Sequence, residues 1–337
     1  RYTVTADGLL IVGSETGMVK LDEVDIVAKG RVGPGQCIGV DLEAGRFYAD
    51  AELKDTLAAR HDFTSWTRRI REIDHIVKTD PGSGSGSGVP GPNLHQGEEL
   101  RRRQLAAGMT LEELETILHP MVDGAQEPVG SMGDDTPIAV LSDRYRGLHH
   151  YFRQAFSQVT NPPIDSLRET RVMTLKTRLG NLGNVLDEDA SQLELLQLES
   201  PVLSTAEFAA MHDYMGASAC LVDCTFERDD GEAGLRAALE RIRREAEEGV
   251  RAGCTHVILT DEAQGAGRVP IPMILATAGV HTHLVRQSLR TFTSVNVRTA
   301  ECLDVHYFSV LIGVGATPVN AYLAEAAIAD RHRRGLF

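Results

Sequence analysis

The sequence predicts an α/β protein whose main domain has parallel strands alternating with helices, preceded by a β-rich region. Two observations support this fold class. In the second part of the chain, apolar runs of strand length alternate with amphipathic stretches of helix length, which is the pattern of parallel βαβ units. In the first part, short apolar runs are separated by Gly- and Asp-containing turns, which is typical of hairpins.

Composition places the boundary between these two parts. The stretch Asp80–Gly97 (DPGSGSGSGVPGPNLHQG) is rich in Gly and Ser, a flexible composition that cannot bury a core. Its regular Gly–Ser alternation fits a natural linker and an engineered replacement equally well. We therefore expect one domain over residues 1–79, a linker over 80–97 and a second domain over 98–337.

Five strands are expected in the first region, bounded by turns such as Gly33-Pro34-Gly35. They cover Tyr2–Thr5, Leu9–Gly13, Met18–Leu21, Cys37–Asp41 and Arg46–Tyr48. Helix-like sequence follows at Glu52–Arg60 and Thr64–Val77. So few short strands do not make an independent domain, so we interpret residues 1–79 as the last part of a larger β-rich domain.

The second region opens with two expected helices, Leu100–Leu105 and Thr110–His119. The second begins with Thr110 and Glu113 spaced as a capping box, in which hydroxyl and carboxylate accept from free N–H groups. Strands are then expected at Ala219–Asp223, His256–Thr260, Phe292–Arg298 and His306–Val314. Helices are expected at Gly234–Ala252, Ile271–Arg290 and Val319–Arg334, the last capped by Thr317 with Pro318 at its first position.

Charge and hydropathy exclude two classes of partner. The chain has 337 residues, of which 34 are Lys or Arg and 48 are Asp or Glu, for a net charge of −14. This acidic balance argues against nucleic acid and against an anionic membrane surface. The longest apolar run, Ile271–Val285, is interrupted by Pro272 and several polar residues, so we expect no membrane span.

The cysteines indicate a reducing compartment. The chain starts at Arg1 without Met or a secretion signal, and we interpret it as part of a longer, cytoplasmic protein. Five scattered cysteines are most simply unpaired thiols. On a strand, Cys220 and Cys224 would share a face but lie too far apart to bridge. Their spacing does not match metal or iron–sulfur ligand sets.

Motif chemistry offers weak candidates. The turn Gly313–Ala316, between an expected strand and helix, has the shape of a phosphate cradle but lacks the third glycine of a dinucleotide fingerprint, so a tight turn without a ligand is favoured. The pairs His149-His150 and His281-His283 are candidate metal ligands, although a helical pattern around the second pair makes its side chains diverge. Asp134-Asp135 is more simply a turn. We expect no catalytic, cofactor-binding or metal-binding residue in this chain.

Longer stretches carry more information than these motifs. They include RYTVTADGLLIVGSETGMVKLDE near the start, and GSMGDDTPIAVLS, QVTNPPIDSLRE, LQLESPVLSTAEF, THVILTDE, HTHLVR and LIGVGATPVNAYLAEAAI later. In their residues and in their order along the chain, these stretches resemble the large subunit of bacterial, NADPH-dependent glutamate synthase. The match covers the end of its class II glutamine amidotransferase domain and its central domain.

This resemblance implies a function for the parent subunit. It would convert glutamine and 2-oxoglutarate to two glutamates, with electrons passed from a reduced nicotinamide by a small flavoprotein subunit. FMN, a 3Fe–4S cluster and the amidotransferase's N-terminal nucleophilic cysteine would lie in parts of the subunit outside this chain. The resemblance also implies that the central domain is a partial flavin-domain-like barrel without catalytic residues, so this piece would be inactive alone.

The family's central domain contributes to the wall of the tunnel that carries ammonia between the two active sites. By this resemblance Met132 and Thr160 correspond to tunnel positions, with Thr136 and Asn161 as weaker neighbours. Two alternatives stay open: a small enzyme that binds a phosphorylated ligand at the Gly313–Gly315 turn, and a scaffold or interaction module.

Overall fold

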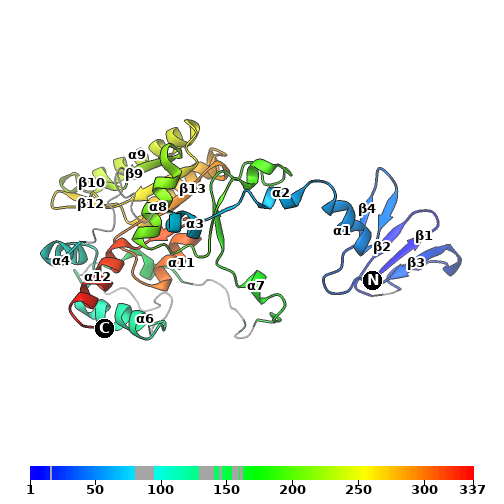
Figure 1. The fold of residues 1–337 in the computed structure, drawn as a ribbon, viewed down its shortest axis with the longest axis horizontal. Coiled ribbons are helices and arrows are strands. Elements are labelled where there is room, and N and C mark those ends of the chain that lie inside the picture. The colour runs from blue at the N-terminus through cyan, green and yellow to red at the C-terminus, as the bar shows by residue number, and fades with distance from the viewer. Residues whose placement is uncertain (16, 80–94, 129–139, 144–145, 154–158, 160–161) are drawn as a thin grey trace. The chain divides into compact units, whose positions relative to one another are not determined.

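The computed structural model describes residues 1–15, 17–79, 95–128, 140–143, 146–153, 159 and 162–337 (Figure 1). These residues form two compact units, Arg1–Arg68 and Arg69–Phe337. Most of the Gly/Ser-rich stretch lies outside the described residues. The second unit takes in a short strand and helix that precede that stretch, so the compact units divide before residue 79.

The first unit is β-rich, as the sequence predicts. Its antiparallel sheet has the order β2-β1-β3, made by β1 (Tyr2–Thr5), β2 (Leu10–Val12) and β3 (Ile26–Gly30). A hairpin of β4 (Gly39–Asp41) and β5 (Arg46–Tyr48) is followed by α1 (Asp50–Ala58) and α2 (Phe63–Thr67). The Tyr2 and Phe47 rings, 5.3 Å apart, join the sheet to the hairpin.

The second unit is built on a parallel sheet of order β14-β13-β11-β9. Its strands are β9 (Ala219–Asp223), β11 (His256–Thr260), β13 (Ser294–Arg298) and β14 (Val319–Asn320). The intervening and following helices are α9 (Gly231–Arg251), α10 (Met273–Arg286), α11 (Val305–Gly313) and α12 (Tyr322–Arg333). This alternation confirms the predicted α/β class.

Smaller elements surround this sheet. They are the sheet of β6 (Arg71–Glu72), β8 (Leu196–Leu198) and β7 (Thr177–Leu179), the pair β10 (Thr225–Glu227) and β12 (Arg268–Pro270), and helices α3 (Ile73–Thr79), α4 (Gly97–Ala106), α5 (Leu111–Glu113), α6 (His119–Asp123), α7 (Glu169–Val172) and α8 (Thr205–Met215). The predicted Thr110 capping box is present, and Leu114–Leu118 continues that helix as a π-helical turn. A second capping box, Ser204 with Glu207, starts α8.

The inner strands β11 and β13 are buried on both faces, as expected for parallel strands, whereas Leu221 of the edge strand β9 is 51% exposed. One face packs Val222, Val257 and Val295 against the apolar sides of α9 to α12. In α9 the buried residues recur every four positions, so the helix presents one narrow apolar stripe to the sheet. The other face contributes Ile258 to a second core, which α3, α8 and the β7–β8 strands complete.

Two expectations in the first 79 residues were wrong. Met18–Leu21 is not a strand, and the strand that follows β2 is Ile26–Gly30, which pairs with β1. Thr64–Val77 is not one helix, because Arg71–Glu72 leaves the helical path to pair with Leu196 and Gln197 of β8. In both places non-local strand pairing overrides the local apolar pattern.

Two expectations near the C-terminal side were also wrong. His306–Val314 is helix α11, which Asp304 caps by accepting from the Tyr307 N–H at 2.8 Å. Thr317 and Pro318 do not cap a helix. They run alongside β13, where the Thr317 N–H donates to the Val295 carbonyl at 2.7 Å. The last helix starts only at Tyr322, after β14.

Charged residues are frequent on α9 and over residues 331–334, and the two segments differ. On α9 they form exposed i,i+4 pairs such as Arg236 with Glu232, which is typical of a solvated helix face. In the segment 331–334, however, the Arg331 side chain is only 6% exposed and reaches Glu115 at 2.9 Å. Among the described residues, no helix is both long enough and apolar enough to cross a bilayer.

Candidate functional site

The four residues expected at a tunnel wall, Met132, Thr136, Thr160 and Asn161, lie outside the described residues. The same holds for the Asp134-Asp135 pair. Those expectations stay predictions. The neighbouring Pro162 and Pro163 are described, and just after them Asp165 accepts from the Leu167 and Arg168 N–H groups, which forms a turn ahead of α7.

The Gly313–Ala316 turn is not a phosphate cradle, because it ends a helix instead of starting one. The Gly315 N–H donates to the Ile312 carbonyl and the Ala316 N–H to the Leu311 carbonyl, both at 3.0 Å. This is the Schellman arrangement, in which a glycine at positive φ closes the helix, and Gly315 has φ +118°. The N–H groups of Gly315 and Ala316 are therefore bonded to carbonyls of their own helix and do not point to a ligand.

Gly315 has a second reason to be glycine. A β-carbon there would collide with the His281 ring on α10. The Gly315 carbonyl also accepts from Arg290 at 3.0 Å, and the same guanidinium donates to His281 Nδ1 at 3.1 Å. Burial and the neighbouring Arg290 charge lower the pKa of His281. The turn is a packing junction between α10, α11 and the start of β13.

The two histidine pairs do not converge on a metal. His281 bonds Arg290, whereas His283 contacts Glu247 of α9 at 2.6 Å, so the pair diverges as the helical pattern predicted. His149 and His150 lie against α11, where His306 Nε2 bonds the His149 carbonyl at 2.9 Å. Burial lowers the pKa of His149 to about 3. Within the described ranges, no three His, Cys, Asp or Glu side chains gather as metal ligands.

The densest polar cluster lies instead at the carboxyl edge of the parallel sheet. We call it the carboxyl-edge cluster; it consists of Asp261, Glu262, Arg298, Asn320 and Tyr322. These residues stand at or just beyond the ends of β11, β13 and β14, where side chains from parallel strands meet. In α/β folds this edge is the usual place for ligands, so it is the first place to look for a site.

Arg298 is the centre of the cluster. Its side chain is 3% exposed, with Nε 2.8 Å from one Glu262 oxygen and Nη2 donating to the other at 2.9 Å. Nη1 donates to the Asn320 Oδ1 at 2.8 Å. The guanidinium also lies 5.2 Å from the centre of the Tyr322 ring. This fork geometry holds β11, β13 and β14 in register.

Asp261 occupies the deepest position in the cluster. One carboxylate oxygen accepts from the Thr299 hydroxyl at 2.7 Å and the Ala300 N–H at 2.9 Å, and the other accepts from the Tyr322 hydroxyl at 2.9 Å. Gln264 in turn donates to that hydroxyl at 3.0 Å. Complete burial nevertheless raises the pKa of Asp261 to about 7.

A row of polar side chains continues from the cluster along one face of the sheet. On this face His256 Nδ1 and the Ser294 hydroxyl lie 2.9 Å apart, and burial lowers the pKa of His256 to about 4. Asn296 follows two residues later, fully buried and with both amide atoms unpartnered. Parallel strands buried on both faces are normally apolar, so this row is unusual.

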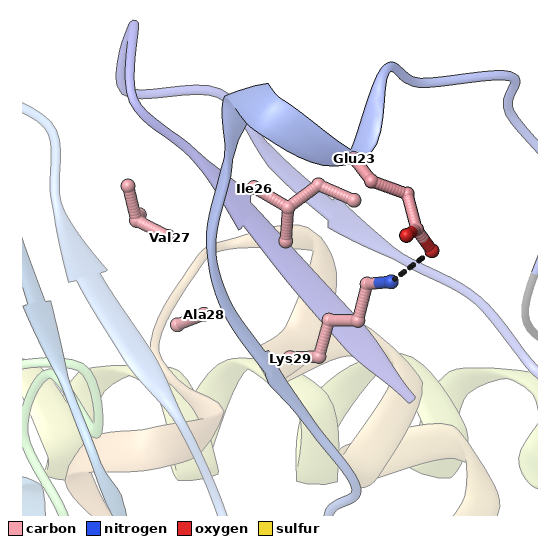
Figure 2. Close-up of a pocket in the computed structure, with 5 residues that line it drawn as sticks. All are labelled: Glu23, Ile26, Val27, Ala28 and Lys29. Atoms are coloured by element: carbon pink, nitrogen blue, oxygen red, sulfur yellow. Dashed lines mark ion pairs between the residues drawn. The ribbon is translucent and has the colours of Figure 1, made fainter.

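The described cavities lie elsewhere. One, of about 300 Å³, is lined by Glu23 and by Ile26 to Lys29 of β3. Figure 2 shows these residues with the ion pair between Glu23 and Lys29, whose charged atoms are 3.5 Å apart. A second, of about 290 Å³, has Cys254 and Phe292 in its wall. Neither includes a member of the carboxyl-edge cluster, whose side chains mostly bond one another, although Arg298 Nε faces Glu262 at 2.8 Å without a well-aligned hydrogen bond. The cluster is therefore a structural core for the strand ends.

Comparisons with known proteins agree with the organisation of the chain. Residues 102–337 match the family described as glutamate synthase central domain, and residues 1–66 match the glutamine amidotransferases class-II. The large chain of NADPH glutamate synthase from Azospirillum brasilense is 64% identical over 337 residues, which is 100% of this chain and 22% of that relative. The corresponding Bacillus subtilis chain is 35% identical over 328 residues, covering 97% of this chain and 20% of that relative.

The likeness extends beyond the NADPH-dependent proteins. Ferredoxin-dependent glutamate synthase 2 of Synechocystis is 38% identical over 332 residues, covering 97% of this chain and 21% of that relative. This chain thus spans about a fifth of the length of these relatives. The chain belongs to the glutamate synthase family, as a central domain preceded by a class-II glutamine amidotransferase region.

Proposed function

We propose that this chain is the part of a glutamate synthase large subunit that connects the amidotransferase site to the synthase site and forms part of the wall of the ammonia tunnel. One observation carries the proposal. A class-II amidotransferase match and a central-domain match follow one another in a single chain, so the chain spans the junction between them.

The reaction of the parent subunit explains why ammonia would have to pass between its two active sites. The subunit would convert glutamine and 2-oxoglutarate to two glutamates, in the cytoplasm, with electrons supplied through a small flavoprotein subunit. FMN and a 3Fe–4S cluster would be bound by other domains. The described cysteines do not fit such a cluster, because Cys224 and Cys302 are fully buried in the core and no set of three or more ligands forms.

An ammonia conduit demands a particular surface. Ammonia has to stay neutral and out of bulk water, so the wall needs apolar groups with a few hydroxyl or carbonyl partners and no carboxylate that would trap ammonium. Met132 and Thr160 have suitable side chains, with Thr136 and Asn161 beside them in sequence. We propose these four as wall residues.

We also propose that the parallel sheet is part of a flavin-domain-like barrel. Its four strands run in the same direction, with helices α9 to α11 connecting them. The polar row of His256, Ser294 and Asn296 would then correspond to the inward face of the barrel, where buried polar side chains are expected more often than on a two-sided sheet.

The purified chain is expected to have neither activity of the parent subunit. The amidotransferase nucleophile is an N-terminal cysteine, and residues 1–66 correspond to the far end of that domain. Ammonia release from glutamine and glutamate formation from 2-oxoglutarate should both stay at the buffer level, with the complete enzyme as positive control. Glutamine turnover above that level would show that this chain holds a glutaminase site.

Replacing Thr160 with valine in the complete enzyme is expected to uncouple the two half-reactions. The substitution removes one hydrogen bond to ammonia, worth about 1 kcal/mol. The rate at which ammonia escapes to solvent should then rise about fivefold relative to the rate at which it reaches the synthase site. The ratio of glutamine hydrolysed to glutamate formed should rise accordingly. Thr116→Val is a matched control, because the Thr116 hydroxyl bonds the Glu112 carbonyl on an exposed helix face. An unchanged ratio in Thr160→Val would remove Thr160 from the wall.

A further inference from the structure

Two cysteines far apart in sequence meet in the second unit. Cys220 is the second residue of β9, and Cys254 follows the turn that ends α9. Their sulfur atoms are 2.6 Å apart, although both are thiols. A disulfide needs its sulfurs about 2 Å apart, so only a small side-chain movement separates the two thiols from a bond.

The backbone around the pair is shaped for this contact. Gly253, at φ +100°, closes α9, and the Cys254 N–H donates to the Gly249 carbonyl at 3.0 Å, which fixes Cys254 just past the helix end. Gly249 also makes room for the partner, because a β-carbon there would lie 2.8 Å from the Cys220 sulfur. Both positions of the pair therefore depend on glycines of the same helix end.

An opening in the surface reaches one member of the pair. The cavity of about 290 Å³, open to solvent, has Cys254 in its wall together with Val250, Leu289 and Phe292. Its lining is largely apolar, and the thiol is the nucleophilic group in it. A disulfide that enters this cavity reaches Cys254, which is 8% exposed, while the partly exposed Cys220 lies next to it on β9.

The two thiols are also unequal in acidity. The contact with Cys220 favours the ionised form of Cys254 and lowers the pKa of the Cys254 thiol, whereas that contact and burial raise the pKa of Cys220. Cys254 is thus the better nucleophile of the two. The remaining cysteines have other surroundings: Cys224 and Cys302 are fully buried, and Cys37 in the first unit contacts Asp50.

We propose that Cys220 and Cys254 form a reversible dithiol–disulfide site that is oxidised by small disulfides of the glutathione type entering through the Cys254 cavity. The Cys254 thiolate, its proton released to solvent, attacks one sulfur of glutathione disulfide and expels one glutathione thiolate. Cys220 then loses its proton, attacks the Cys254 sulfur and expels the second glutathione. Two electrons pass from the protein to the disulfide, and one bond ties β9 to the end of α9. This site is independent of the proposed tunnel function.

The site is tested by titrating the full chain with mixtures of reduced and oxidised glutathione and then counting thiols in denaturant after an acid quench. The five thiols of the chain are expected to fall to three, with a mass lower by two hydrogen atoms and a linked pair of peptides that contain Cys220 and Cys254. Dithiothreitol should restore all five. This peptide map uses the unaltered protein, so it does not depend on whether any variant folds.

Single-cysteine variants test the order of the steps. Cys220→Ser should stop at a glutathione adduct on Cys254, and Cys254→Ser should form an adduct at position 220 more slowly, because burial still raises the pKa of Cys220. Cys37→Ser is the matched control and should still lose two thiols. The proposal is overturned if five thiols persist across the titration, if the unaltered protein stops at a mixed disulfide, or if the bond joins other cysteines.

Discussion

Replacing Arg298 with methionine is expected to lower the free energy of unfolding of the second unit by about 3–5 kcal/mol, the usual cost of removing one partner of a buried ion pair. Methionine has a similar length and keeps the packing against the Phe208 and Tyr322 rings, which lie 5.8 and 5.2 Å from the guanidinium. The loss is therefore electrostatic. It leaves the Glu262 carboxylate, 18% exposed, without its counter-charge.

The measurement is urea unfolding followed by far-ultraviolet circular dichroism. Fluorescence is unsuitable, because the single tryptophan, Trp66, belongs to the first unit. Arg236→Met is the matched control: it also breaks an Arg–Glu pair, but with Glu232 on an α9 face where both side chains are more than three-quarters exposed. That variant should lose about 0.5 kcal/mol or less. Equal losses in the two variants would show that Arg298 contributes no more than a surface pair.

The fold could be predicted where a strand is a short run with an apolar centre that lies between helices. Ala219–Asp223 and His256–Thr260 were expected with the bounds that the structure gives. The same reasoning failed for Val305–Gly313, because a short apolar run does not distinguish a buried strand from a buried helix. A signal was present, since Asp304 is a good cap and His306, Tyr307, Val310 and Leu311 have helical spacing.

Elements made by non-local pairing left no local signal. β14 has two residues, and it exists because the segment from Thr317 to Asn320 adds to the edge of β13. The same holds for β6, which pairs with a strand more than a hundred residues later. A sequence pattern reports the preference of a segment, whereas these elements are set by a partner that folding brings to them.

The carboxyl-edge cluster could have been found from the sequence. Two expected strands each end in a polar pair, Asp261-Glu262 after THVILT and Arg298-Thr299 after SVNV. The carboxyl ends of parallel strands meet at one edge, so an acid after one strand and an arginine at the end of the next predict an ion pair. The Cys220–Cys254 contact, by contrast, depends on how α9 ends against β9, and its spacing in the chain carries no information.

Asp261 is expected to make the second unit less stable as the pH rises. Burial raises its pKa from 3.8 to about 7 in the folded protein, so between these values the folded state holds a proton that the unfolded state has already lost. The contribution of this group is thus fully present below about pH 3.8 and is lost as the pH rises through about 7. At about 1.4 kcal/mol per pH unit, the whole change is about 4 kcal/mol.

The free energy of unfolding of the wild type, measured against pH, would not isolate the contribution of Asp261. Burial also lowers the pKa of His149 to about 3 and that of His256 to about 4. Those histidines add stability as the pH rises toward the ordinary histidine value, which opposes Asp261. Their contributions cancel when the free energy of unfolding of Asp261→Asn is subtracted from that of the wild type at each pH. Relative to the variant, the wild type should lose about 4 kcal/mol between pH 3.8 and about 7.

Asp229→Asn serves as the control for removing one carboxylate, because the Asp229 side chain is 88% exposed beside α9. The free energy of unfolding of Asp229→Asn should differ from that of the wild type by a constant amount over the same pH range. A flat difference between wild type and Asp261→Asn would mean that the hydrogen bonds from Thr299, Ala300 and Tyr322 offset the cost of burial. Asp261 would then be ionised in the folded protein, and the carboxyl-edge cluster would hold two carboxylates, the buried Asp261 and the partly exposed Glu262, against the single charge of Arg298.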